Sequence, residues 1–248
     1  MLICSKFRFA SVPRFSWSSQ RAMSDSPLDI HDWRAQYLNK EEPILDESKL
    51  STHNPFKLFD MWIKNVAADK TATFEEVNAV CLSTVGKDLR PSSRMVLLKS
   101  YANDVFSFYT NCNSRKGREL QENPNACMLF YWPRVHRQVR IEGKISRLPN
   151  EDAVAYWNSR PLASRIGSKS SEQSEVVPNR DYLTSKQKAL EERAEREGPD
   201  SITKPDSWGG YALVPDYFEF WQGQSDRLHD RIEFRRCDGN WKIQRLSP

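Results

Sequence analysis

The sequence predicts a mainly β protein with added helices (α+β), built on an antiparallel sheet or barrel. Short runs rich in Val, Ile, Leu, Phe and Tyr recur along the chain, and residues that favour turns separate them. Helical spacing of apolar residues is confined to a few segments, and there is neither an internal repeat nor a regular strand–helix–strand alternation. A parallel α/β fold needs that alternation, so clustered strands with helices between them favour an antiparallel architecture.

The N-terminal residues 1–24 carry the whole net charge of +4. Four of the 37 Lys and Arg residues lie there beside no Asp or Glu, so the remaining 33 bases balance the 33 acids of the chain. A basic leader that is rich in Ser and free of acids is typical of an organelle transit peptide. A disordered extension, with Met23 as an internal start, is the alternative. The neutral body disfavours a large anionic partner such as nucleic acid.

The rest of the chain is expected to comprise an N-terminal segment over 25–53, with one amphipathic piece over 30–38, and a single domain over 54–248. The five cysteines are scattered without a C-x-x-C pair, which is typical of reduced thiols, and Cys81 and Cys127 are expected to be small buried residues. No apolar stretch is long enough for a secretory signal or a membrane span. We therefore expect a cytoplasmic or mitochondrial protein that is not secreted.

The first expected helix begins at Asn54-Pro55, an N-cap residue followed by proline at the first helical position. Apolar residues from Phe56 to Val66 follow at helical spacing. The period then changes, and strands are predicted over 77–85, 92–99, 105–110, 126–132 and 137–148. The last of these alternates most clearly, with aliphatic residues on one face and polar residues on the other.

Three further helices are expected over 114–122, 150–160 and 180–197. The first ends at Asn123-Pro124 and the second is stopped by Pro161, because proline cannot continue a helix. The third is so rich in charged residues that it is expected to lie on the surface. The chain then returns to strands, over 208–214, 217–222, 231–236 and 241–246.

Several catalytic motifs are missing. The nine glycines form neither G-x-G-x-x-G nor a Walker loop, and no two of them have the spacing of G-x-S-x-G. The four histidines show neither H-E-x-x-H nor another paired spacing of metal ligands. The sequence therefore disfavours a Rossmann fold, a P-loop, triad hydrolysis and metal catalysis, and we expect no metal site.

Basic residues among the strands point instead to small anionic ligands. Arg94 and Lys99 bracket an apolar run, and charges at the ends of a buried strand are costly unless an anion meets them. Ser114-Arg115-Lys116 opens a helix directly after a strand, where free N–H groups and side-chain cations can hold a phosphate. An ordinary surface helix is the alternative.

A second candidate phosphate site lies near the end of the 150–160 helix. Tyr156 and Arg160 are one helical turn apart, and Ser164 follows Pro161. Their hydroxyl and guanidinium groups can together bind one phosphate. Taken singly, Tyr156 would be a core aromatic residue and Arg160 a partner of the helix dipole.

A third cluster comprises Arg227, His229 and Arg231, which alternate along the chain and share one face if the chain is extended. Three cationic or titratable groups repel one another unless something electron-rich lies opposite. That group is either a ligand or the carboxylates of Asp226 and Asp230.

In their order along the chain, the motifs resemble the pyridoxamine 5′-phosphate oxidase family. They are R-M-V-L-L-K at 94–99, Y-T-N at 109–111, S-R-K at 114–116, R-Q-V-R at 137–140, S-R-P at 159–161, Q-S at 173–174, W-G-G at 208–210, W-Q-G at 221–223 and R-L-H-D-R at 227–231. The resemblance spans about residues 28–248. The combination of R-L-H-D-R with S-R-K and R-Q-V is highly specific.

The resemblance implies an FMN-binding split β-barrel that works as a homodimer with FMN at the subunit interface. It implies that FMN is bound by Arg94, Met95, Val96, Leu97, Tyr109, Thr110, Arg115, Lys116, Gln138, Gln173, Ser174, Trp221 and Arg231. It also implies that the substrate phosphate is bound by Lys99, Tyr156, Arg160 and Ser164. The catalytic residues Arg227 and His229 would then contact the reacting side of the substrate ring. Arg34 and Tyr37 would belong to a lid within 25–53.

The activity so implied is that of an oxidoreductase of vitamin B6 metabolism, which acts on CH–NH₂ donors with oxygen as acceptor. Pyridoxamine or pyridoxine 5′-phosphate would be oxidised at C4′ to pyridoxal 5′-phosphate, with a hydride equivalent passing to flavin N5 and O₂ becoming hydrogen peroxide. Another split-barrel flavoprotein, which would lack the substrate residues, and a nucleic-acid binder are the alternatives. We expect neither nucleic acid nor membrane as a partner.

Overall fold

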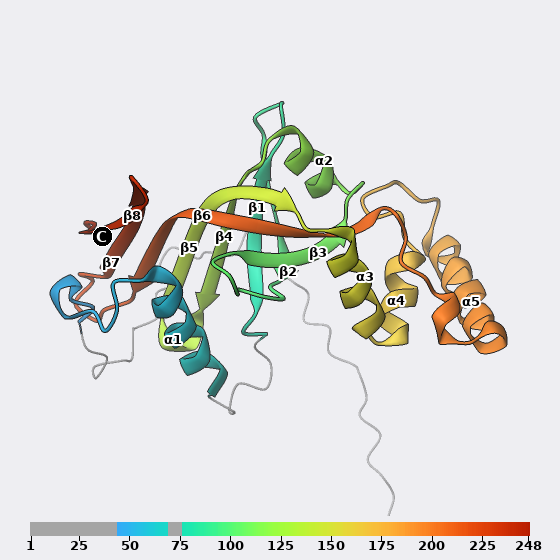
Figure 1. The fold of residues 1–248 in the computed structure, drawn as a ribbon, viewed down its shortest axis with the longest axis horizontal. Helices are drawn as coiled ribbons and strands as arrows, with labels where there is room; N and C mark the ends of the chain where they lie inside the picture. Colours follow the sequence, from blue (N-terminus) through green and yellow to red (C-terminus); the bar gives the residue numbers. More distant parts are fainter. Residues whose placement is uncertain (1–43, 69–75) are drawn as a thin grey trace, which may run out of the picture. The chain divides into compact units, whose positions relative to one another are not determined.

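The described part of the chain, residues 44–68 and 76–248 of this computed structural model, contains eight antiparallel strands (Figure 1). They are β1 (Ala79–Val85), β2 (Pro91–Leu97), β3 (Phe106–Asn111), β4 (Asn125–Trp132), β5 (Arg137–Arg147), β6 (Trp208–Gln222), β7 (Asp230–Cys237) and β8 (Asn240–Arg245). The predicted fold class, antiparallel β with added helices, is confirmed. The expectations for residues 1–24, 30–38, Arg34 and Tyr37 lie outside the described residues.

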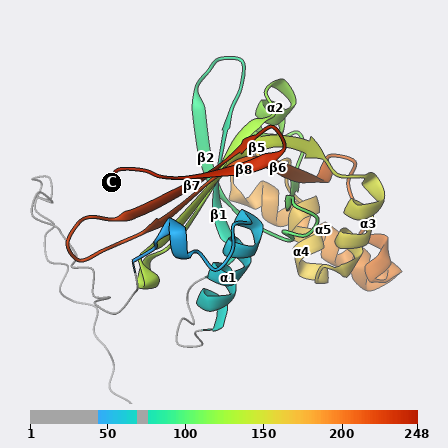
Figure 2. The same ribbon diagram turned by 60° about the vertical axis from the view of Figure 1, so that its left-hand side comes forward.

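The strands form a ring from which a hairpin extends. Neighbouring strands follow the order β2-β1-β4-β5-β6, and β3 pairs with β6. An isolated bridge between Ser100 and Ser107 links the segment after β2 to β3, which closes the ring. The β7–β8 hairpin pairs with the second half of β6 and reaches past the ring strands, as Figure 2 shows.

Strand β6 is continuous where the sequence predicted two strands. Pro215, which lies between the two predicted strands, lacks an N–H group that could donate to a neighbouring strand. Glu142 pairs with Tyr217 and Gly143 pairs with Pro215, so that Asp216 is an extra residue in a β-bulge. Gly143 permits this close approach, because a Cβ there would lie 2.1 Å from the carbonyl oxygen of Val214. The bulge therefore accommodates the proline without ending the strand.

Five helices occur in the described ranges: α1 (Pro55–Ala68), α2 (Arg115–Glu122), α3 (Asn150–Ser159), α4 (Leu162–Lys169) and α5 (Arg180–Glu197). The Asn54 side chain accepts from the backbone N–H groups of Phe56 and Lys57, so the predicted N-cap of α1 is confirmed. Helix α4 was missed. Pro161 ends α3 as predicted, but its carbonyl then accepts from Ser164 N and Arg165 N and begins a new helix.

Alternate residues of the ring strands point inward and meet the apolar stripe of α1. The buried stripe comprises Leu58, Phe59, Trp62, Ile63 and Val66. The ring of Phe59 makes edge contacts with Phe106 and Phe130, at centroid distances of 5.0 and 5.1 Å. A second buried cluster joins α3, α4 and α5 to Trp208 at the start of β6. The site described below lies beside this second cluster.

The cysteine expectation was wrong in its details. Val80 and Leu82 are buried inside the barrel, so Cys81 between them faces outward and is only partly buried. Cys127 is also partly buried, whereas Cys112 is buried. Within the described ranges, no helix is both long and apolar enough to cross a membrane.

We predict that Gly143→Ala destabilises the protein by about 2–3 kcal/mol, because its Cβ would overlap the Val214 carbonyl in the bulge. Gly167→Ala is the matched control: a Cβ there has no neighbour within 4 Å, and alanine within α4 stabilises by about 0.5–1 kcal/mol. Urea unfolding of both variants measures the two free energies. Equal unfolding midpoints would show that the bulge tolerates a side chain.

Candidate functional site

Two cavities adjoin each other beside β2, β3 and α4. We call the first, of about 550 Å³, the Arg160 cavity, and the second, of about 520 Å³, the Lys116 cavity. Tyr109, Thr110 and Gln173 line both cavities. No Asp or Glu of the described ranges lines either of them. The two cavities therefore share a wall and are both suited to anions.

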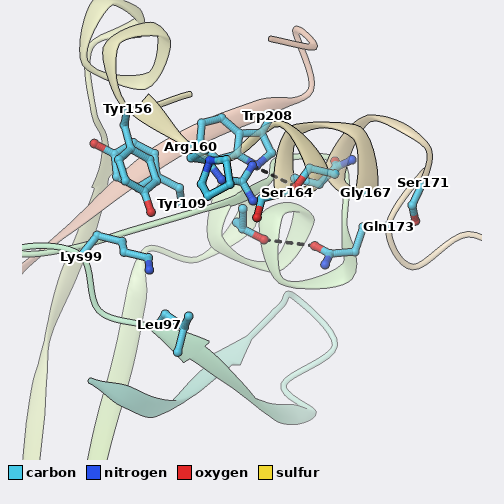
Figure 3. Close-up of a pocket in the computed structure, with 14 residues that line it drawn as sticks. Leu97, Lys99, Tyr109, Tyr156, Arg160, Ser164, Gly167, Ser171, Gln173 and Trp208 are labelled. Carbon is cyan, nitrogen blue, oxygen red and sulfur yellow. Dashed lines mark hydrogen bonds between the residues drawn. The ribbon is translucent and has the colours of Figure 1, made fainter. Parts of the chain in front are cut away.

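The Arg160 cavity brings together all four residues expected to bind the substrate phosphate. Lys99 follows β2, Tyr156 lies on α3, Arg160 is the C-cap of α3, and Ser164 lies in the first turn of α4. Figure 3 shows these side chains arranged around the cavity. The unpredicted helix α4 begins directly after Pro161 and thereby places Ser164 next to Arg160.

An aromatic stack forms one wall of the Arg160 cavity. Tyr109 stacks on Tyr156 at a centroid distance of 4.2 Å and on Trp208 at 5.3 Å. The guanidinium carbon of Arg160 lies 5.1 Å from the centroid of Trp208, and its Nη1 donates to Ser168 Oγ at 3.0 Å. Burial lowers the pKa of Arg160 and raises that of Tyr109. The stack thus holds a partly desolvated guanidinium in place.

Trp208 and Ser168 also line the Arg160 cavity, although neither was predicted as a site residue. The only signal for Trp208 was the motif W-G-G, and its glycines have a steric role. A Cβ on Gly210 would lie 2.7 Å from Cε1 of Tyr109. The bare glycine backbone therefore leaves room for the tyrosine ring of the stack. Nothing in the local sequence marks Ser168 as a partner of Arg160.

The Lys116 cavity gathers most of the residues expected to bind FMN: Arg94, Met95, Val96, Tyr109, Thr110, Arg115, Lys116, Gln173 and Ser174. Leu97 lines the adjoining Arg160 cavity. Helix α2 begins at the S-R-K motif, as expected. Ser114 is its N-cap, and the Ser114 side chain accepts from Gly117 N. The helix therefore begins at the cavity and carries two cations in its first turn.

Lys116 is buried, and its side-chain hydrogen-bond partners in the described ranges are all neutral. Its Nζ donates to Gln173 Oε1 at 2.9 Å and to Thr110 Oγ1 and Ser114 Oγ at 3.2 Å each. Burial, followed by the charge of Arg94, lowers the pKa of Lys116 to about 8. An anion bound in this cavity would favour the charged form of Lys116 and would therefore oppose the lowering of its pKa by burial and by Arg94. The donor set, two guanidinium groups, an ammonium group and hydroxyls, fits a phosphate ester.

The expectation that Arg94 and Lys99 bracket the apolar run of a buried strand was wrong. Strand β2 ends the sheet path, its residues are partly or fully exposed, and Met95 is 63% exposed. Arg94 itself forms an ion pair with Glu119 at 3.3 Å. Its position at the cavity is therefore set by a buried carboxylate.

The remaining predicted residues form a separate group, which we call the distal group: Gln138, Trp221, Arg227, His229 and Arg231. Gln138, Trp221 and Arg231 are paired in register across β5, β6 and β7, and the ring of His229 lies 5.1 Å from that of Trp221. Trp221 and the cavity residue Trp208 lie near opposite ends of β6. At the usual rise of a strand, they are roughly 40 Å apart along it.

The predicted shared face of Arg227, His229 and Arg231 is wrong. Arg227 lies in a turn with φ of +67°, so the chain is not extended there. The backbone N–H of Gln224 donates to Nδ1 of His229 at 3.0 Å, so the proton of the neutral ring is on Nε2. Arg231 pairs with Glu219 at 2.7 Å.

The alternative in which Asp226 and Asp230 balance this cluster is not supported. Asp230 pairs with Arg245 at 2.8 Å, and Asp226 accepts from the backbone N–H of Leu228. Glu219, on the neighbouring strand, is the carboxylate that meets Arg231. Cross-strand register brings this pair together, and the local sequence does not show it.

The ring of antiparallel strands and the two adjoining cation-lined cavities define a split-barrel protein. Residues 67–193 match the family described as pyridoxamine 5′-phosphate oxidase, and residues 208–248 match the pyridoxine 5′-phosphate oxidase C-terminal dimerisation region. The chain belongs to the pyridoxamine 5′-phosphate oxidase family and is an oxidoreductase. The dimerisation region supports a homodimer.

Individual relatives agree with this assignment. A pyridoxamine 5′-phosphate oxidase homologue of Caenorhabditis elegans is 66% identical, over 91% of this chain and 100% of its own. The pyridoxine-5′-phosphate oxidase of Bos taurus is 46% identical, over 89% of this chain and 88% of its own. A similar solved structure is the crystal structure of PhzG from Burkholderia lata 383 in complex with tetrahydrophenazine-1-carboxylic acid. The two chains share 29% sequence identity, and they superpose with a TM-score of 0.76 over 84% of this chain and 98% of PhzG.

We predict that binding of FMN, the phosphate ester implied by the resemblance, weakens about tenfold between pH 7 and pH 9. Lys116, with a pKa of about 8, loses its charge over this range, whereas the phosphate is already a dianion. Flavin fluorescence titration at each pH measures the affinity. Lys116→Met should bind more weakly at pH 7 and lose this dependence; an unchanged pH profile in the variant would contradict the assignment.

Proposed function

We propose that the protein is an FMN-dependent oxidase that converts pyridoxamine and pyridoxine 5′-phosphate to pyridoxal 5′-phosphate, with O₂ reduced to hydrogen peroxide. The observation that carries this proposal is the pair of cation-lined cavities with a common wall. Cofactor and substrate are both phosphate esters in this reaction, and each needs its own anion site close to the other. Family membership supports the same reaction.

In this proposal the Lys116 cavity takes the FMN phosphate and the Arg160 cavity takes the substrate phosphate. Arg94, Arg115 and Lys116 supply cations to the first. Lys99 and Arg160, with the hydroxyls of Tyr156 and Ser164, supply donors to the second. The shared wall of Tyr109, Thr110 and Gln173 then separates the two phosphates.

We infer that the distal group completes the site of a second copy of the chain, with FMN at the interface. Its separation from the cavities along β6 prevents it from reaching the cavities of its own chain. Trp221, Arg227, His229 and Arg231 all lie within the dimerisation region, 208–248. In a twofold dimer, each chain can supply its distal group to the cavities of its partner.

Bound FMN would supply the acceptor for the hydride that leaves C4′ of the substrate. The chain's own contribution is placement: a phosphate held by Lys99 and Arg160 fixes one end of the substrate and removes part of the entropic barrier. Arg227 acts electrostatically on the ring, because a guanidinium is not deprotonated in proteins. His229, whose Nδ1 accepts from Gln224, exchanges protons at Nε2.

The proposal is tested by measuring the absorption spectrum of the purified chain and the formation of peroxide and aldehyde from pyridoxamine 5′-phosphate. Flavin absorbance with turnover is the expected result. Flavin absorbance without turnover would identify a different split-barrel flavoprotein. Salt-dependent nucleic-acid binding without flavin absorbance would favour the nucleic-acid alternative.

Arg160→Ala should raise KM for pyridoxamine 5′-phosphate about 10- to 100-fold, because a charge-assisted hydrogen bond to phosphate contributes about 1.5–3 kcal/mol. Its FMN content should stay near that of the wild type, since Arg160 does not line the Lys116 cavity. Steady-state kinetics with the phosphorylated substrate and with pyridoxamine provide the comparison. A similar loss for both substrates would place Arg160 outside the phosphate site.

Arg227→Ala and Arg231→Ala should separate catalysis from cofactor binding. We expect Arg227→Ala to reduce turnover by at least about 100-fold while FMN stays bound, because its charge acts on the substrate ring. Arg231→Ala should lower the flavin-to-protein ratio, since Arg231 is paired in register with Trp221 of the cofactor set. Equal loss of turnover and flavin in both variants would show that the two roles are assigned wrongly.

A further inference from the structure

Glu119 is a buried carboxylate on α2, beside the Lys116 cavity but not part of its lining. Its Oε1 accepts from Nε of Arg115 at 2.8 Å. Its Oε2 accepts from Ser92 Oγ at 2.6 Å and from Nη2 of Arg94 at 3.3 Å. One carboxylate thus connects two arginines that come from different elements, β2 and α2.

Thr84 adds a further anchor from β1. Its hydroxyl donates to Oε2 of Glu119 and accepts from Nη1 of Arg94 at 2.6 Å. Thr84 is buried and does not line the Lys116 cavity. Both partners of the Arg94–Glu119 ion pair are therefore fixed from behind the cavity.

The cations of this cavity repel one another. The charge of Arg94 contributes to the lowered pKa of Lys116, and the charge of Arg115 acts in the same direction on Arg94. Burial alone would raise the pKa of Glu119, but hydrogen bonds from Ser92, Thr84 and Arg115 outweigh it and lower the pKa to about 2. Glu119 is therefore ionised at any pH at which the protein works.

The charges around the cavity match those of a phosphate monoester. Arg94, Arg115 and Lys116 are cations, and Glu119 offsets one of the three. The positive charge that remains, about +2, is equal in size and opposite in sign to the charge of about −2 that a phosphate monoester carries at neutral pH. Because Glu119 does not line the cavity, it can perform this function without meeting the ligand.

We propose that Glu119 is a positioning residue for the cofactor phosphate: it holds the guanidinium groups of Arg94 and Arg115 side by side at the Lys116 cavity. This inference rests on the proposed function, in which that cavity takes FMN. Glu119 acts through the two arginines, and its role is to preorganise them before the ligand arrives.

Positioning and simple charge predict opposite results for Glu119→Gln. If only net charge mattered, removal of a negative charge near the cavity would strengthen the binding of an anion. If Glu119 positions the arginines, the neutral amide holds them less well and the binding of FMN weakens. Glutamine keeps the size of the side chain, so packing changes little.

The test is a fluorescence titration of the flavin-free chain with FMN and with riboflavin, which lacks the phosphate. Glu119→Gln should weaken FMN binding about tenfold, the usual size for loss of a charge-assisted hydrogen bond, and should change riboflavin binding by less than about twofold. Glu122→Gln is the matched control. It removes the same charge one turn further along α2, where the carboxylate accepts from Lys87 N, and should leave both affinities unchanged.

Thr84→Val provides a second variant in case Glu119→Gln does not fold. It leaves every charge in place and removes only the anchor behind Arg94 and Glu119, so FMN binding should weaken several-fold with riboflavin binding unchanged. A thermal melt of each flavin-free variant identifies loss of folding.

Two results would overturn the positioning role. They are FMN binding by Glu119→Gln that equals or exceeds that of the wild type, and equal weakening of FMN and riboflavin, which would indicate a general structural effect. A wild-type chain that binds neither flavin overturns the proposed function instead. In that case, the affinities of the wild type and of Glu119→Gln for inorganic phosphate are compared. Weaker phosphate binding by the variant then shows that Glu119 positions the arginines for an anion, and equal or stronger binding overturns that role.

Discussion

The pairing of β6 with its neighbours is the constraint on which the rest of the structure depends. One edge of this strand pairs with β5 along nearly its whole length, and the other edge pairs first with β3 and then with β7. The first half of β6 therefore belongs to the ring and carries Trp208 into the Arg160 cavity. The second half carries Trp221 and leads to His229 and Arg231. A single strand thus holds two groups of site residues far apart, which supports a site shared between two chains.

The bulge at Gly143 makes this arrangement possible. Pro215 has no N–H group to donate, and it lies where β6 passes from its pairing with β3, which ends at Leu213, to its pairing with β7, which begins at Tyr217. Here the extra residue Asp216 restores the pairing, and the missing side chain of Gly143 allows the two backbones to approach. Ring and hairpin remain one continuous sheet as a result.

Much of the fold could be predicted from local patterns, and the misses have physical causes. Local patterns predicted the N-cap at Asn54, the start of a helix at Ser114 and the alternation of β5 correctly, because helix starts and periodicity depend on neighbouring residues. Helix α4 was missed, since Pro161 both ends one helix and begins the next. The expected extended face at Arg227 was wrong, because a residue with positive φ cannot be recognised from alternation of charges.

The sequence by itself determined the fold class, the family and the identity of most residues around the two cavities. These depend on residue type and on spacing along the chain, which the sequence contains directly. Only the tertiary structure decided how the charges are balanced: Glu119 joins Arg94 to Arg115, Glu219 meets Arg231, and Trp208 stacks beside Arg160. Most of these contacts connect residues from different elements. Their energies depend on distance and burial, which are set only when the sheet closes and the helices pack against it.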